Sequence, residues 1–151
     1  MKEPTFRINW SGRALEYTRD EVNAVVEAMN SADPLTQGRY LRQFEKDFAK
    51  YNGSSHCFAV ASCTNALDLT ALLTGVGAGD EVIMPAHTFC ATAIPFARTG
   101  AKIVWADIDP ETRLIAAETI RRLLNRRTKA IVVVHLYGLM ADMDPIVSLA
   151  R

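Results

Sequence analysis

The sequence predicts an α/β protein with three layers, in which helices cover both faces of a mostly parallel β-sheet. After residue 54, short apolar runs of strand length alternate with helical patterns, which indicates consecutive βαβ units. The chain has 151 residues, of which 49% are hydrophobic and 23% charged. This is one domain's length, with enough apolar side chains to bury a sheet on both faces.

Residues 1–35 have a different pattern and are predicted to form an N-terminal helical segment. Thr18-Arg19-Asp20-Glu21 has the spacing of a capping box, and valines follow it at helical spacing. Asp33-Pro34 ends this helix in a turn. A second turn, Thr36-Gln37-Gly38, opens the remaining part of the chain, residues 36–151.

Later elements follow from apolar spacing and from glycine. Leu41, Phe44, Phe48 and Tyr51 form one stripe of a helix, and Gly53 is its expected C-terminal stop. The alternating elements are then strands near 56–61, 81–84, 102–107 and 129–135, and helices near 64–75, from Thr88 to Gly100, near 116–125 and from about Asp142.

Charge and hydropathy exclude several classes of partner. Basic and acidic residues number 17 each, so no net charge attracts nucleic acid or an anionic membrane. The basic cluster at 121–127 is interpreted as the end of an amphipathic helix, where cations are favoured. The longest aliphatic run, 130–134, is too short to cross a membrane.

The cysteines indicate a reducing compartment. Cys57, Cys63 and Cys90 show no metal-binding spacing, and no apolar signal segment follows Met1. We therefore expect reduced thiols in a cytoplasmic protein, and no metal site.

A strand-to-helix junction at Ala61-Ser62-Cys63-Thr64 is the first candidate site. Small residues there leave the N–H groups of the helix's first turn open, and the positive end of the helix dipole favours a phosphate. Phe89 follows the next strand and offers an aromatic face. Together they suit a phosphorylated planar cofactor. A nicotinamide-binding Rossmann domain fits poorly, because the glycines of 75–79 lie between a helix and a strand.

Several blocks occur in one order from about residue 8 onward: Leu35–Gly38, Phe44–Ala49, Ser62–Leu67, Gly77–Pro85, His87–Thr92, Asp107–Thr112, Thr128–Ile131, Val134–Gly138 and Ala141–Asp144. This set resembles the DegT/DnrJ/EryC1/StrS family of nucleotide-sugar aminotransferases, which have the pyridoxal-phosphate fold type I. The resemblance implies that the chain is the N-terminal part of the large cofactor-binding domain.

The resemblance also implies roles for individual residues. Ser62, Cys63 and Thr64 would surround the phosphate of pyridoxal 5'-phosphate, and Phe89 would stack on its pyridine ring. Leu35, Thr36 and Gln37 would line the sugar pocket. His135 and Tyr137 lie at the end of a strand, a position where ligands bind in open α/β sheets, but a structural role is expected for His135.

The implied reaction transfers an amino group from a glutamate-like donor to a keto sugar on a nucleotide, in amino-sugar or polysaccharide biosynthesis. The Schiff-base lysine and the acid that pairs with the pyridine nitrogen would both lie beyond Arg151, so no catalytic residue is assigned and the chain alone is expected to be inactive. The family implies a homodimer when the protein is full length. The isolated segment is expected to be poorly soluble or dependent on a partner, and a monodisperse, cooperatively unfolding monomer would count against that expectation. Two alternatives stay open: a dehydratase of the same family, and a non-catalytic binding or dimerising module.

Overall fold

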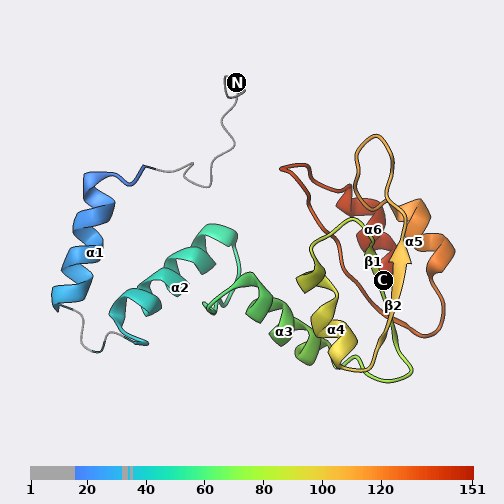
Figure 1. Ribbon diagram of the computed structural model, residues 1–151, viewed down its shortest axis with the longest axis horizontal. Helices are drawn as coiled ribbons and strands as arrows, with labels where there is room; N and C mark the ends of the chain where they lie inside the picture. Colours follow the sequence, from blue (N-terminus) through green and yellow to red (C-terminus); the bar gives the residue numbers. More distant parts are fainter. Residues whose placement is uncertain (1–15, 32–33, 35) are drawn as a thin grey trace, which may run out of the picture. The chain divides into compact units, whose positions relative to one another are not determined.

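The computed structural model describes residues 16–31, 34 and 36–151, which belong to two compact units, Met1–Ala59 and Val60–Arg151 (Figure 1). The expected division after residue 35 remains a prediction. None of the helices in the described ranges is long and apolar enough to cross a membrane.

The first unit contains α1 (Arg19–Ser31) and α2 (Arg39–Asn52). The predicted capping box starts α1: the Thr18 N–H donates to Glu21 Oε2 over 2.6 Å, and the Glu21 N–H donates to Thr18 Oγ1 over 3.2 Å. Gly53 ends α2 with φ of 69°, and the next N–H, that of Ser54, donates to the Ala49 carbonyl over 3.0 Å. Both helix boundaries predicted from local signals are confirmed.

The predicted strand near 56–61 is wrong. This segment pairs with no strand of the described residues. Its backbone instead bonds locally and to α2, since the Ala59 N–H donates to Glu45 Oε1 over 2.9 Å. An apolar run becomes a strand only when another strand completes its hydrogen bonds, and the described part of this unit contains only helices. Phe58 is accordingly 80% exposed.

The second unit contains the sheet. Its elements are α3 (Cys63–Thr74), β1 (Glu81–Pro85), the 3-10 helix η1 (Cys90–Thr92), α4 (Ile94–Arg98), β2 (Lys102–Ala106), α5 (Ala117–Leu123), β3 (Thr128–Ile131) and α6 (Met143–Ala150). The three strands are parallel in the order β2-β1-β3.

Two of the predicted elements differ from the structure. The strand expected over 129–135 begins at Thr128 and ends at Ile131; beyond it the Val132 N–H still donates to the Ile83 carbonyl over 2.8 Å. The helix expected from Thr88 to Gly100 is divided into η1 and α4. Pro95 explains the division, because it has no N–H to continue a helix from the preceding turn and is favoured in a first turn.

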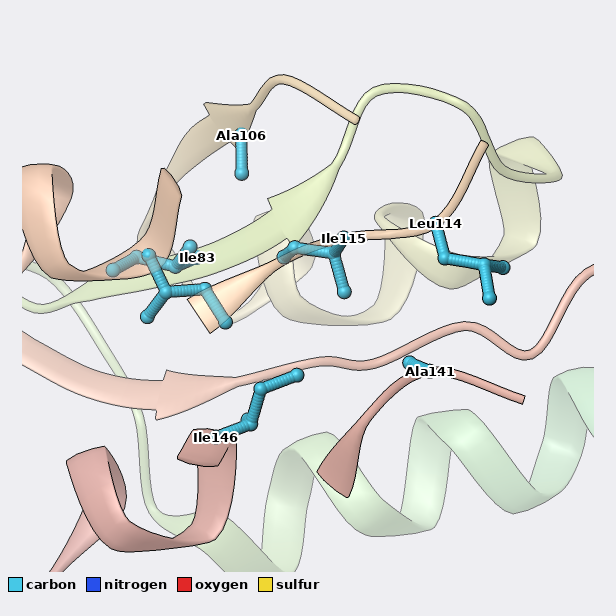
Figure 2. Close-up of a cluster of buried hydrophobic side chains, with 7 residues drawn as sticks. Ile83, Ala106, Leu114, Ile115, Ala141 and Ile146 are labelled. Atoms are coloured by element: carbon cyan, nitrogen blue, oxygen red, sulfur yellow. The ribbon is translucent and has the colours of Figure 1, made fainter. Parts of the chain in front are cut away.

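The central strand β1 is buried on both faces. Val82 and Met84 pack with Ala71 of α3 and Phe96 of α4. Ile83 points the opposite way and belongs to a second cluster of buried side chains, which includes Ile146 of α6 (Figure 2). Helices α3 and α4 therefore cover one face of the sheet and α5 and α6 the other, which confirms the predicted three-layer α/β architecture.

The crossovers make β1 the point where the winding of the sheet reverses. The connection through α4 leads from β1 to β2, and the connection through α5 leads from β2 back across β1 to β3. Right-handed crossovers in opposite directions place their helices on opposite faces, as the two clusters show. In open parallel sheets, ligands bind beyond the carboxyl ends of the strands at such a reversal.

The amino ends of all three strands meet at Glu81, which is 3% exposed. Its carboxylate accepts a hydrogen bond from Asn125 Nδ2 over 2.7 Å and lies 2.8 Å from Arg127 Nη2 and 3.4 Å from Lys102 Nζ. The Asn125 hydrogen bond, assisted by the two cations, holds the pKa of Glu81 below its ordinary value, although burial opposes this. This cluster holds the amino ends of the strands together, at the end of the sheet opposite to the candidate site.

Candidate cofactor-binding site

The N-terminus of α3 is capped by the first of the three predicted phosphate residues. Ser62 is extended, its hydroxyl oxygen accepts the Asn65 N–H over 3.2 Å, and its hydroxyl lies 2.9 Å from Asn65 Oδ1. By helix geometry, the N–H groups of Cys63 and Thr64 have no acceptor inside α3. Both residues are exposed. The structure thus places two open N–H groups and the Thr64 hydroxyl together at the positive end of a twelve-residue helix.

Phe89 lies in the connection that follows β1. Its backbone is extended, with φ of −75° and ψ of 143°, and its carbonyl accepts the Thr92 N–H over 2.9 Å. A second bond, 2.8 Å between the hydroxyls of Thr88 and Thr92, fixes the same segment. The Phe89 ring is nevertheless 73% exposed. A ring held by an ordered backbone but left in solvent is available to a ligand and is not part of the core.

The order of the elements predicts that Phe89 lies at the same end of the sheet as the open N–H groups of Cys63 and Thr64 and the Thr64 hydroxyl, which together are called the cup. The short connection 75–80 joins the end of α3 to the start of β1, as in a βαβ unit whose helix runs antiparallel to its strands. Twelve helical residues span about 18 Å and five strand residues about 17 Å. In that arrangement the start of α3 would be level with the carboxyl end of β1, where Phe89 follows.

Helix α4 and the 3-10 helix η1 both contact α3. Arg98 Nη1 at the end of α4 lies 3.7 Å from Asp68 Oδ1 in the middle of α3, and η1 also contacts α3. Phe89, the residue immediately before η1, therefore adjoins a segment that contacts α3.

The three residues expected to line a sugar pocket belong to the first unit. Leu35 lies outside the described residues. Thr36 and Gln37 are exposed, and Gln37 has a left-handed backbone with φ of 54°. The Gln37 carbonyl accepts a hydrogen bond from Arg42 Nη1 over 3.1 Å. Gly38 is required next to it, because a Cβ there would overlap the Pro34 carbonyl oxygen. The pocket role of all three residues remains a prediction.

Two aromatic residues that received no cofactor role from the sequence meet at the carboxyl ends of neighbouring strands. His87 follows β1 and Tyr137 follows β3, and their ring centroids are 5.9 Å apart with an edge-to-face angle of 61°. His135, by contrast, is structural as expected, because its Nδ1 accepts the Ala141 N–H over 3.1 Å. The sequence shows that His87 and Tyr137 each follow a strand. It does not show that the two rings meet, because that depends on the order of the strands in the sheet.

The chain is similar in sequence to a known protein family and to individual members of it. The family model of the DegT/DnrJ/EryC1/StrS aminotransferase family matches residues 16–151. GDP-perosamine synthase from Caulobacter vibrioides is 42% identical over 132 residues, which cover 87% of this chain and 36% of that protein. Spore coat polysaccharide biosynthesis protein SpsC from Bacillus subtilis is 42% identical over 133 residues, which cover 88% of this chain and 34% of that protein.

Solved structures extend the likeness from the sequence to the fold. NtdA from Bacillus subtilis with bound cofactor PMP matches with a TM-score of 0.80 and 37% identity, covering 88% of this chain and 31% of that one. The chain thus spans about a third of the length of the proteins it matches. The match across nearly all the described residues shows that the chain belongs to the DegT/DnrJ/EryC1/StrS aminotransferase family.

Proposed function

We propose that this chain forms the cofactor-phosphate-binding part of a pyridoxal-phosphate-dependent aminotransferase that acts on a keto sugar carried by a nucleotide. The proposal rests on an open helix N-terminus and an exposed aromatic ring, which the order of the elements predicts to lie at one end of the sheet. The names of the relatives support the substrate class, since GDP-perosamine synthase is named for a nucleotide-linked sugar. The bound PMP in NtdA supports the cofactor class.

The phosphate group of pyridoxal phosphate fits the start of α3. A phosphate dianion needs several donors, and the N–H groups of Cys63 and Thr64 with the Thr64 hydroxyl supply three of them. The Ser62 hydroxyl keeps the helix start in place through Asn65. We assign Thr64 the main side-chain contact and Ser62 the role of organising the cup.

Phe89 fits the planar ring of the same cofactor. Stacking on an aromatic face contributes about 0.5–1.5 kcal/mol beyond burial of the ring. Since the Phe89 backbone is fixed by hydrogen bonds to η1, its ring restrains the plane of a ligand whose phosphate is held at α3. When bound, pyridoxal phosphate supplies an electron-withdrawing ring that makes amino transfer possible. This chain's share is to bind, orient and partly desolvate that ring.

The four lysines in the part of the chain that the structure describes do not suit the covalent step. Lys46 and Lys50 are exposed on α2. Lys102 pairs with Glu81 at the amino edge of the sheet, and Lys129 is exposed near the same end of β3. Lys2 lies outside the described residues. We therefore propose that the 151 residues bind the cofactor without forming a stable bond to it at one specific lysine.

The affinity of the chain for pyridoxal phosphate tests the proposal. We expect saturable binding that weakens about tenfold in Thr64→Val, which loses one hydrogen bond to a charged group. Thr70→Val is the matched control, because the Thr70 hydroxyl bonds only to the Ala66 carbonyl in the middle of the same helix.

Borohydride reduction of the mixture, followed by peptide mapping, tests the covalent part. We expect scattered substoichiometric adducts. One stoichiometric lysine adduct with transaminase activity would contradict the proposal for the lysines, and equal affinity of the Thr64 and Thr70 variants would contradict the cup.

A further inference from the structure

We propose, on the basis of the proposed function, that His87 is a ligand-binding residue of this site. Its Nδ1 is held without a partner so that it can accept a hydrogen bond from a hydroxyl group of the bound ligand, once Tyr137 moves away. The inference assigns a polar contact to a residue that lies two positions before Phe89, the ring expected to stack on the cofactor.

The first observation is an unsatisfied nitrogen. Among the described residues, His87 Nδ1 is the one buried side-chain nitrogen or oxygen atom without a hydrogen-bond partner. Native proteins pair nearly all such atoms, because leaving one unpaired costs about 1–3 kcal/mol. A cost of that size calls for a reason, and the position of His87 beyond the carboxyl end of β1 is where ligands bind in open parallel sheets.

The other two histidines of the chain do not have a buried ring nitrogen without a hydrogen-bond partner. His135 Nδ1 is paired with the Ala141 N–H. His56 also lies beside an aromatic ring, with centroids 6.5 Å from Phe58, but it is exposed and water can satisfy it. His87 alone combines an aromatic neighbour with a closed-off, unpaired nitrogen.

The second observation concerns Tyr137, which lies edge-to-face with His87. Its backbone is left-handed, with φ of 55°, and this conformation is unfavourable for a bulky residue. Gly138 continues the same turn with φ of 81°. Two unfavourable features therefore touch one another at the carboxyl ends of adjacent strands, and such features gather at functional sites. Because Tyr137 is 77% exposed, few packing contacts oppose its displacement.

The chemistry of the nitrogen indicates the ligand group. A neutral imidazole carries a proton on one nitrogen and accepts at the other. We assign the proton to Nε2, so that Nδ1 accepts and the complementary group is a hydroxyl donor. The proposed reaction offers two sources, the hydroxyl on the ring of pyridoxal phosphate and the hydroxyls of the sugar, and titration with each ligand distinguishes them.

The experiment uses the full chain with Trp10→Phe, which leaves Trp105 of β2 as the only tryptophan and therefore as a reporter of the second unit. The variants are His87→Phe, which keeps an aromatic edge without nitrogen, and His87→Asn, which keeps a short polar side chain. His56→Phe is the matched control. Thermal unfolding and titrations with pyridoxal phosphate, and with GDP-mannose in the presence of pyridoxamine phosphate, are followed by Trp105 fluorescence.

We expect His87→Phe to raise the unfolding midpoint by several degrees, since it removes the unpaired nitrogen, and to weaken ligand binding about tenfold. His87→Asn retains most of the affinity, and His56→Phe changes neither quantity. If His87→Phe loses affinity for pyridoxal phosphate, the hydroxyl that His87 accepts from is the one on the cofactor. If it loses affinity only for GDP-mannose, that hydroxyl belongs to the sugar.

Two results would overturn the inference. If the parent chain binds pyridoxal phosphate and His87→Phe binds each ligand as tightly as the parent does, His87 has only a packing role and the proposed function stands. If the parent chain does not bind pyridoxal phosphate at all, the proposed function fails and the inference fails with it.

Discussion

Glu81 of β1 is a buried carboxylate whose neighbours come from β2 and from the segment just before β3. It is the first residue of β1, Lys102 is the first residue of β2, and Arg127 precedes β3. A buried ionised group persists only when its hydrogen-bonding capacity is used, and here Asn125 and two cations use it. The cluster therefore aligns the amino ends of the strands. The proposed ligand site lies beyond the carboxyl ends.

The lowered pKa of Glu81 makes this contribution dependent on pH. Because the pKa of Glu81 is lower in the folded than in the unfolded chain, the ionised carboxylate stabilises the folded state at pH values above the ordinary pKa of 4.5. This stabilisation is lost as the pH falls through the lowered pKa. We expect Glu81→Gln to lower the unfolding midpoint at pH 7, and the difference from the parent chain to shrink as the pH falls toward 3.

Thermal unfolding of the two proteins across this pH range measures the effect. Glu118→Gln is the control, because Glu118 also pairs with two arginines, Arg121 and Arg122, but its side chain is 58% exposed. Exposed ion pairs contribute little, so this variant should unfold like the parent. Equal effects of the two substitutions would show that burial of Glu81 is not the cause.

Single residues also show how far sequence reasoning extends. The predicted strand-to-helix junction placed Ser62 and Thr64 at a helix start, and the structure confirms the helix start but not the preceding strand. Judged by its apolar side chain alone, Phe89 belongs in a core, yet its ring is in solvent. The left-handed backbones of Gln37 and Tyr137 carry no glycine-like signal, because they depend on what the surrounding loop imposes.

At the scale of elements, helices were predictable where their signals are local. The capping box of α1 and the glycine stop of α2 act within a few residues of the chain, and both occur as predicted. Strands depend on distant partners. The apolar run at 56–61 satisfies every local criterion of a strand, but in this chain its backbone bonds to Glu45 of α2 instead.

Hydrogen exchange tests this difference between two apolar segments. We expect the amides of Cys57, Phe58 and Val60 to exchange quickly, since they belong to no ladder of the described residues. The amides of Val82 to Met84 lie in the paired central strand and should be protected by several orders of magnitude more. Similar protection of the two segments would mean that 56–61 is paired after all.

At the scale of the whole molecule, the alternation of strands and helices was sufficient to predict a parallel sheet covered on both faces. It did not predict the strand order, because an apolar run of strand length does not show which strands it pairs with. That order places β1 at the centre and brings His87 to Tyr137. The expected homodimer and the sugar pocket stay predictions, since they concern surfaces beyond one unit.

The central claim is that the start of α3 binds the phosphate of pyridoxal phosphate. The most direct test is to follow the backbone amide resonances of Cys63, Thr64 and Asn65 during titration of the isotopically labelled chain. We predict saturable shifts of these amides with pyridoxal 5'-phosphate and no comparable shifts with pyridoxal, which lacks the phosphate. Equal shifts with both compounds, or shifts confined to other parts of the chain, would contradict the account.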